Sequence, residues 1–128
     1  MTHTYSFEKL EVWKEARLLV VWTYKMAAYF PQEEKFGLVM QMRRASISVV
    51  SNLAEGSARK TAKDQAYFTQ LAYSSLIELL NQLIISFDLE YLSEGILAEG
   101  REKIEQLTRK ISALRNAQLN PKPSSLNS

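Results

Sequence analysis

The sequence predicts an all-α protein, a single domain that folds as an antiparallel up-down-up-down four-helix bundle. Three observations lead to this fold class. The 128 residues contain only 4 glycines and 3 prolines, so long stretches have no residue that interrupts a helix. In these stretches apolar residues recur three and four positions apart, which is the spacing of an amphipathic helix. Hydrophobic residues make up 46% of the chain, enough for one core.

The first expected helix covers residues 8–30 and ends before Pro31, because a proline disfavours helical backbone at the preceding residue. It carries two apolar stripes, and few polar positions remain between residues 18 and 30. One small core cannot easily cover both stripes, so part of this helix is expected to meet another subunit. The residues expected at this oligomer interface are Val12, Leu19, Trp22, Met26 and Phe30.

The second expected helix covers residues 33–58, and Gly56 is interpreted as its end or as a point of close packing. Its apolar residues also form two neighbouring rows at helical spacing. The expected main stripe consists of Phe36, Met40, Ile47, Val50 and Ala54, with Val39, Met42, Val49 and Leu53 beside it.

The third and fourth expected helices cover residues 62–90 and 94–118. Thr61-Ala-Lys-Asp64 has the form in which a hydroxyl and a carboxylate satisfy unpaired N–H groups at a helix start, and Ser93 is the expected N-cap of the last helix. The last helix has a narrow apolar stripe, so its cations are expected to form a basic outer face. Flanking the bundle of residues 8–118, residues 1–7 are expected to be flexible and residues 119–128 to be a disordered tail.

Polar residues inside the second and third helices are interpreted as structural. If the turn between these helices centres near residues 60–61, Arg43 and Arg44 lie level with Glu78. One charge-assisted arginine–glutamate pair between the helices is therefore expected, with nucleic-acid contact as the alternative for either arginine. Asn52 is expected to form a buried hydrogen bond between helices.

Composition argues against most enzyme classes of this size. The chain has no cysteine and one histidine, His3, which excludes thiol catalysis, zinc fingers, Ser-His-Asp triads and H-E-x-x-H metal sites. No catalytic residue, metal or cofactor is expected. The N-terminal segment lacks the pattern of a signal peptide and no stretch is apolar enough to span a membrane, so a cytoplasmic location is expected.

Charge alternates along the chain although the net charge is only +2. Residues 35–63 carry six positive charges and one negative charge, whereas residues 64–100 carry six acids and no lysine or arginine. Residues 101–128 carry six positive and two negative charges. This pattern has two interpretations: basic surfaces for an anionic partner, or complementarity between helices of the same molecule.

The first interpretation predicts a nucleic-acid-binding module, with RNA preferred and little sequence specificity, because no base-reading module is present. The expected contact residues are Arg59, Lys60 and Lys63 at the turn between the second and third helices, followed by Lys103, Lys110 and Arg115. The alternative is an oligomeric protein-interaction scaffold without nucleic-acid affinity. Its site would be the rim of the first helix or the acidic stretch 78–99.

Several segments together resemble a known family. They are Leu10-Glu-Val-Trp13-Lys-Glu-Ala16, Phe30-Pro-Gln-Glu-Glu34 with Phe36-Gly37-Leu38, Gln41-Met-Arg-Arg-Ala45, Ser48 with Asn52-Leu-Ala-Glu-Gly56, and Glu78. Over about residues 7–118 the chain resembles the bacterial four-helix-bundle proteins encoded in intervening sequences of 23S ribosomal RNA genes. One departure is Ser74-Ser75, where that family often has Gly-Ser.

The resemblance implies an antiparallel four-helix bundle that assembles as a ring-shaped homo-oligomer, with a pentamer favoured. It also implies an RNA-linked genetic context without an established activity. A related branch is similar to the accessory proteins of diversity-generating retroelements, which are basic pentamers that bind nucleic acid and a reverse transcriptase. The partners that the resemblance implies are therefore further copies of the chain, RNA and a protein such as a reverse transcriptase.

Overall fold

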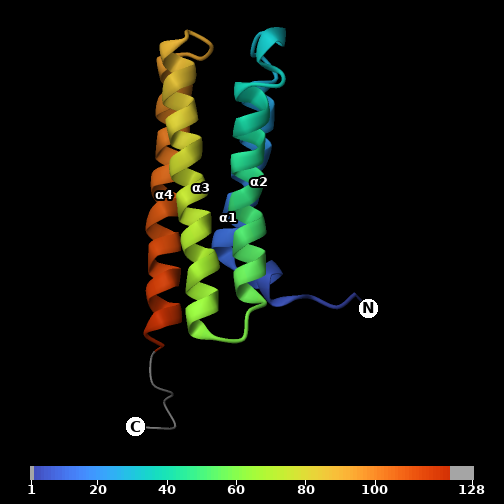
Figure 1. Ribbon diagram of the computed structural model, residues 1–128, viewed down its shortest axis with the longest axis vertical. Helices are drawn as coiled ribbons and strands as arrows, with labels where there is room; N and C mark the ends of the chain where they lie inside the picture. Colours follow the sequence, from blue (N-terminus) through green and yellow to red (C-terminus); the bar gives the residue numbers. More distant parts are fainter. Residues whose placement is uncertain (1, 122–128) are drawn as a thin grey trace.

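The computed structural model describes residues 2–121, and within that range it contains four α-helices and no strand (Figure 1). Two short 3-10 helices precede the first two α-helices. In chain order the elements are η1 (Ser6–Lys9), α1 (Glu11–Ala27), η2 (Gln32–Glu34), α2 (Leu38–Ser57), α3 (Ala62–Asp88) and α4 (Glu94–Leu119). The predicted all-α four-helix bundle is confirmed.

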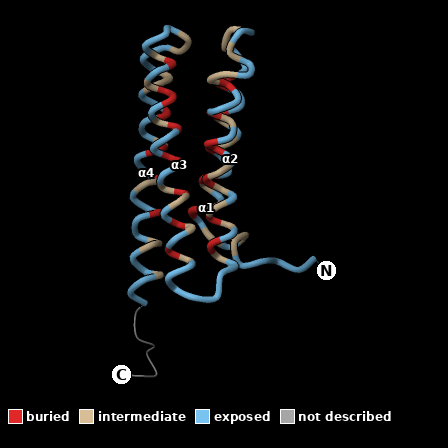
Figure 2. Tube along the Cα trace, in the orientation of Figure 1, coloured by how far each residue is buried: buried red, intermediate tan, exposed pale blue. Residues whose placement is uncertain are grey.

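Consecutive helices are antiparallel neighbours. The most extensive packing joins α2 to α3 and α3 to α4, α1 packs on α2, and the contact between α1 and α4 is narrower (Figure 1). Buried residues lie on the sides of the helices that face one another (Figure 2). The largest side chains buried almost completely at the centre are Met42, Leu53, Leu76, Leu79, Leu83, Ile104, Leu107 and Ile111.

Helix starts and stops follow local chemistry. The hydroxyl oxygens of Thr61 and Ser93 accept hydrogen bonds from the N–H groups of Asp64 and Ile96, both at 3.1 Å. Both predicted N-caps are therefore confirmed. At the end of α3, Glu90 has a φ of 63°, in the left-handed region that favours glycine. The N–H of Tyr91 then donates to the carbonyl of Ser86, which closes the helix end.

The loop between α1 and α2 is longer than expected, because α1 ends at Ala27 and α2 begins only at Leu38. Residues 28–30 form a turn, and η2 follows Pro31 as a separate short element. Oε1 of Glu34 accepts a hydrogen bond from the N–H of Leu38 at 3.2 Å, so this carboxylate caps α2. This cap places the start of α2 at Leu38, five residues after the predicted start at residue 33.

The same loop is tied to the turn between α3 and α4. The hydroxyl of Tyr91 donates to Oε2 of Glu34 at 3.0 Å, and the rings of Phe30 and Tyr91 are 5.5 Å apart. The hydrogen bond to Glu34 raises the pKa of Tyr91, since the carboxylate favours the protonated phenol. Two loops far apart in sequence are thereby held together at this end of the bundle.

The structure contradicts the predicted interface of α1, and on α2 it buries the apolar row that was named second. Val12, Leu19 and Met26, predicted to meet another subunit, are buried in the core, and Trp22 and Phe30 are half-buried against it. The apolar side chains that α1 exposes are instead Leu18, Val21 and Tyr24, and Tyr29 is exposed in the turn that follows. On α2 the buried row is Val39, Met42, Val49 and Leu53, whereas Met40 and Ile47 are exposed, as is Phe36 just before the helix.

The chain ends differ from the middle of the bundle. At the N-terminal end, Ser6 begins η1, and its hydroxyl lies 3.3 Å from Oγ of Ser57 at the end of α2. At the other end Leu119 closes α4, and Asn120 and Pro121 follow without helical structure. The remainder of the expected disordered tail, residues 122–128, lies outside the described residues. Within residues 2–121 no helix combines the length and hydropathy needed to cross a membrane.

Candidate nucleic-acid interface

The turn between α2 and α3 brings together the three cations that were expected to bind phosphate. Arg59, Lys60 and Lys63 are all exposed. The turn itself is closed by hydrogen bonds, because Nε2 of Gln65 donates to the carbonyl of Arg59 at 3.0 Å and Thr61 caps α3. We call Arg59, Lys60 and Lys63 the basic turn. Its backbone is fixed while its charged groups reach solvent.

Close packing of α2 on α3 sets the position of this turn. Gly56 is buried, and a Cβ atom added there would lie 3.1 Å from Cβ of Phe68 and 3.3 Å from the carbonyl oxygen of Gln65. The absence of a side chain thus lets the two helices approach directly below the turn, and the interpretation of Gly56 as a close-packing point is confirmed. The guanidinium carbon of Arg59 lies 4.3 Å from the ring centre of Phe68, a cation–π contact that orients the arginine.

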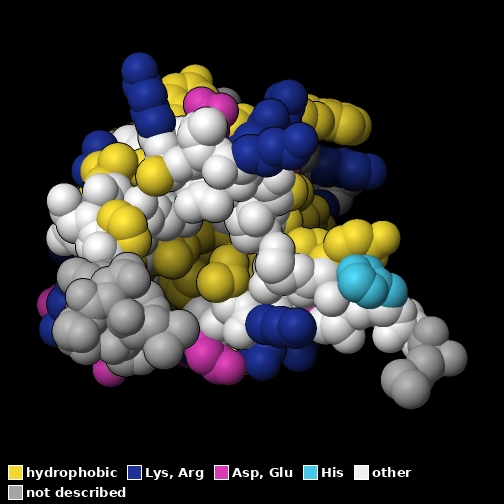
Figure 3. Space-filling model, turned by 90° about the horizontal axis from the view of Figure 1, so that it is seen from below, with side chains coloured by type: hydrophobic (Ala, Val, Ile, Leu, Met, Phe, Trp, Pro, Cys, Tyr) yellow, Lys and Arg dark blue, Asp and Glu magenta, His cyan; other side chains and the backbone are white. Residues whose placement is uncertain are grey.

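An exposed aromatic ring lies next to the basic turn. Tyr67 is 60% exposed and makes an edge contact with Phe68, with ring centres 5.4 Å apart. Tyr67 follows Lys63 by four residues, so both side chains are neighbours on one side of α3. Figure 3 views this end of the molecule, and Lys and Arg side chains gather there beside hydrophobic ones. The exposure of Tyr67 depends on the rotation of α3 in the bundle, which the sequence alone does not determine.

The cations of α4 are less uniform than the predicted basic outer face. Lys110 is exposed, but its ammonium lies 2.6 Å from Oε2 of Glu15 on α1. Lys103 is half-buried and lines a small hollow between α1 and α4 together with Glu15. Arg115 is also half-buried, with its Nε atom shielded from solvent. Lys110 is therefore neutralised by an ion pair within the molecule. The prediction that Lys103 and Arg115 lie on an exposed face is wrong.

The expected ion pair between α2 and α3 is absent from the structure. Between residues 2 and 121 the ion pairs are Lys14–Glu11 and Lys110–Glu15, so neither Arg43 nor Arg44 pairs with Glu78. Arg44 and Glu78 do lie about level along the bundle axis, as predicted, but both side chains are exposed to solvent instead of pairing between the helices. The Glu78 carboxylate accepts a hydrogen bond from Gln82 at 3.3 Å. Arg43 instead lies over the ring of Tyr24, with its guanidinium carbon 4.7 Å from the ring centre.

Small hydroxyl groups join α2 and α3 where the ion pair was expected. Oγ of Ser75 donates to Oγ of Ser48 across the helix contact at 2.8 Å. Nδ2 of Asn52 donates to Oγ of Ser48 at 3.0 Å and to its carbonyl oxygen at 2.8 Å. Asn52 therefore bonds within its own helix and reaches α3 only through Ser48. The prediction of a direct interhelical bond from Asn52 is wrong. The hydrogen bond that crosses between the two helices comes from Ser75 instead.

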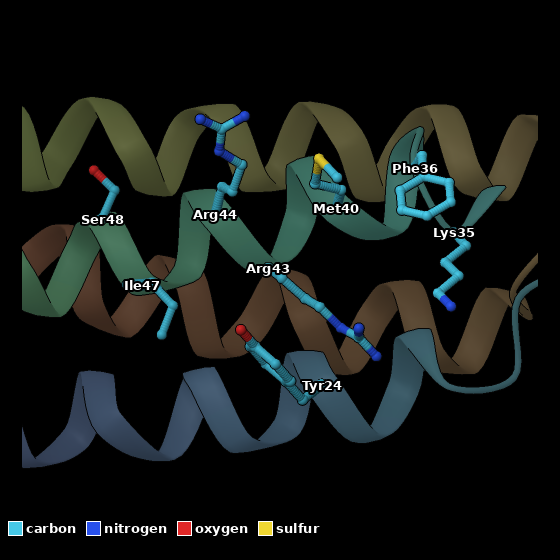
Figure 4. Close-up of a pocket in the computed structure, with 8 residues that line it drawn as sticks. All are labelled: Tyr24, Lys35, Phe36, Met40, Arg43, Arg44, Ile47 and Ser48. Atoms are coloured by element: carbon cyan, nitrogen blue, oxygen red, sulfur yellow. The ribbon is translucent and has the colours of Figure 1, made fainter.

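A hollow of about 560 Å³ lies on the outer side of α2 and extends to α1 (Figure 4). Its apolar lining is Tyr24, Phe36, Met40 and Ile47. Its polar lining is Lys35, Arg43, Arg44 and Ser48, so it carries three cations and no acid. In Figure 4 Tyr24 and Arg43 approach each other between α1 and α2, while Arg44 projects from another side of α2. We call these eight residues the basic groove.

The basic groove was not predicted from the sequence, because Phe36, Met40 and Ile47 were expected in the main apolar stripe of the second helix. The sequence did contain a signal for the groove. The row of Val39, Met42, Val49 and Leu53 is by itself enough to form the core side of α2, so the other apolar row was available for the surface. Phe36 is 77% exposed, and the ammonium of Lys35 lies 5.5 Å from its ring centre. An exposed aromatic and aliphatic row thus lies next to three cations on this side of the molecule.

The part of the chain that the structure describes contains no candidate metal site. No group of three or more histidine, aspartate or glutamate side chains lies close enough together there to hold a metal ion. The fold and its surfaces thus define a class of protein: a small antiparallel four-helix bundle with an exposed basic turn at one end and a basic, partly apolar groove on its side.

Comparison with protein families gives the particular group. Residues 8–113 match the family model of the 23S rRNA-intervening sequence protein. The chain therefore belongs to this family, and the resemblance noted from the sequence is confirmed. No curated protein matched the chain.

Proposed function

We propose that the protein is a non-catalytic, oligomeric helical bundle that binds RNA or another nucleic acid through the basic turn, mostly without sequence specificity. The observation that carries this proposal is the exposure of Arg59, Lys60 and Lys63 on a rigid turn, none of which takes part in an ion pair between described residues. Complementarity within the molecule thus accounts for Lys110 but not for the basic turn.

Three cations on one turn suit a chain of phosphates. Each contact neutralises one phosphate and releases a counterion, so affinity depends on salt and little on base sequence. A single chain with so few contacts binds weakly, but several copies in one assembly add their contacts through multivalency. We therefore include homo-oligomerisation in the proposal, with a pentamer as the assembly that the family resemblance favours. A reverse transcriptase as protein partner is a further proposal from the same resemblance, and a cytoplasmic location is proposed from the sequence pattern of the N-terminal segment.

The proposal is tested by titrating labelled RNA with the wild-type protein and with the double variant Lys60→Glu, Lys63→Glu. Its matched control is Arg101→Glu, Arg109→Glu, which makes the same change in net charge at two exposed positions of α4. Loss of binding in the first variant and retention in the control would support the basic turn as the site. Equal weakening in both variants would reduce the effect to net charge and overturn the assignment.

A protein-interaction scaffold is the second candidate function, and the basic groove is the observation that favours it. The groove offers apolar anchors and cations to an acidic, amphipathic partner. Under this alternative the Lys60→Glu, Lys63→Glu variant keeps its partner, because the groove lies on α1 and α2 away from the turn. Wild-type protein that binds no RNA at low salt, but captures a protein partner, would replace the first function with this one.

A further inference from the structure

A second exposed face has the opposite charge to the basic groove. On α3 the side chains of Ile77, Ile85 and Leu89 are exposed, and the carboxylates of Glu78 and Asp88 are exposed beside them. These positions recur at helical spacing and so share one side of α3. The surrounding sequence, residues 64–100, has no lysine or arginine. We call these five residues the acidic face.

We propose that the basic groove of one copy receives the acidic face of a second copy of this chain. The two surfaces match in chemistry, because each combines exposed apolar side chains with charges of one sign. The groove holds three cations and no acid, whereas the acidic face holds two carboxylates and no cation. The inference rests on the proposed homo-oligomer and assigns the surfaces that join its copies.

The two surfaces also match in height along the bundle. Ser48 and Ser75 are in contact, and α2 and α3 run in opposite directions from that pair. Equal steps away from it along the two helices therefore reach the same level. One step leads from Ser48 to Ile47 and two steps lead from Ser75 to Ile77, so these two exposed side chains lie about level. By the same counting Arg44 lies about level with Glu78, within one helical position.

Equal height determines how two copies can stand. If they lie side by side and point in the same direction, α2 of one runs antiparallel to α3 of the other. Arg44 then meets Glu78 of the second copy. Ile47 reaches the level of Ile77 of the second copy, so an apolar contact lies beside the charged one. No shift along the bundle axis is needed to form both contacts.

The same charges do not satisfy one another within a single chain. Arg44 and Glu78 are both exposed, and the ion pairs between described residues include neither of them. The groove opens where α2 meets α1, at Tyr24, whereas the acidic face belongs to α3. Because the joined surfaces are different, the contact is heterologous, and each copy keeps one unused surface for the next.

This arrangement has a consequence for the proposed RNA binding. Copies that point in the same direction present their basic turns at the same end of the assembly. Three cations from every copy are thereby concentrated on one rim, where phosphate contacts from a single RNA add together. Assembly through the groove would thus strengthen binding at a turn that the groove residues do not touch.

The test measures molar mass by size-exclusion chromatography with light scattering for the full chain and four variants. Arg44→Glu and Glu78→Arg each place like charges across the proposed contact and should lower the assembled fraction at least tenfold. The double variant Arg44→Glu, Glu78→Arg restores opposite charges and should recover the assembly. Arg109→Glu, an exposed charge reversal on α4 outside both surfaces, is the control and should assemble like the wild type. Circular dichroism checks that every variant keeps its helices.

The outcomes separate the interface from the oligomer. Wild-type protein that assembles while both single variants assemble equally well would overturn the interface and leave the proposed homo-oligomer standing. Disruption by both single variants without recovery in the double variant would overturn the Arg44–Glu78 pairing. Wild-type protein that is monomeric at high micromolar concentration would overturn the oligomer and this interface together. Binding of a synthetic acidic amphipathic helix by such a monomer would assign the groove to a different protein instead.

Discussion

The contact between α1 and α4 gives a sharp expectation for Gly100→Ala. Gly100 is buried, and a Cβ atom there would lie 2.7 Å from the Cη2 atom of Trp22 and 2.9 Å from Cδ1 of Leu83. Neither neighbour yields easily. The indole Nε1 of Trp22 donates to the Glu99 carboxylate at 3.0 Å, and Leu83 is fully buried. The added methyl group must therefore push apart side chains that hold α4 against α1 and α3.

The magnitude follows from two opposing effects. Forcing a methyl group into a packed core costs roughly 1–3 kcal/mol, whereas alanine stabilises a helix interior by about 0.5–1 kcal/mol over glycine. We expect Gly100→Ala to destabilise the fold by about 1–2 kcal/mol. In a domain of this size the thermal midpoint then falls by roughly 3–10 °C.

The assay is thermal unfolding followed by circular dichroism, with Gly95→Ala as the matched control. Gly95 lies on the same helix and is exposed, and a Cβ atom added there would lie 3.8 Å from Oγ of Ser93, so its alanine variant should be more stable than wild type. The two variants should thus shift the midpoint in opposite directions. A Gly100→Ala protein as stable as the Gly95→Ala protein would refute the close packing of Trp22 on α4.

Three further outcomes are expected. Tyr67→Ala should lower the affinity for single-stranded RNA by roughly 5- to 150-fold, since stacking one base contributes about 1–3 kcal/mol, while Tyr29→Ala, which removes an even more exposed ring elsewhere, should have no effect; equal effects in a fluorescence titration would exclude stacking on Tyr67. Glu90→Gly should raise the free energy of unfolding by about 1 kcal/mol, because glycine adopts the φ of 63° without strain, whereas Glu90→Ala should give no such gain in urea titration. The raised pKa of Tyr91 means that the folded state holds the phenol proton more tightly than the unfolded state. The stabilising contribution of the Tyr91–Glu34 hydrogen bond is therefore present below pH 10 and is lost as the pH rises through the raised pKa. Ultraviolet titration should show that Tyr91 ionises at lower pH in Glu34→Gln than in the wild type, and an unchanged curve would contradict the hydrogen bond.

Local signals in the sequence were sufficient where one short segment decides the structure. The hydroxyls of Thr61 and Ser93 cap helices because their partners lie three residues away. The narrow stripe of α4 placed Ile104, Leu107 and Ile111 in the core correctly, since that helix has only one apolar side. Basic residues next to a helix start and Gly56 likewise indicated an exposed turn, which the structure contains.

Helices with two apolar sides could not be oriented from the sequence. On α1 the two apolar stripes have the same periodicity, and only the neighbouring helices decide which stripe is buried. The same ambiguity concealed the basic groove, because Phe36 fits a core stripe as well as an exposed row. For Arg44 and Glu78 the level was predictable from chain reversal, but the side of each helix was not. Sequence periodicity thus fixes heights and spacings, while rotation about the helix axis depends on packing.

The most direct measurement of the proposed function is the salt dependence of RNA affinity. Binding of single-stranded RNA would be recorded at several salt concentrations for the wild type and for Lys60→Ala, Lys63→Ala. Each phosphate contact contributes about 0.7 to the slope of log affinity against log salt, so three contacts give about 2 for each chain engaged. We expect the double variant to lower that slope by about 1.4 for each chain engaged. An identical slope in both proteins, or no binding by the wild type even at low salt, would contradict RNA binding through the basic turn.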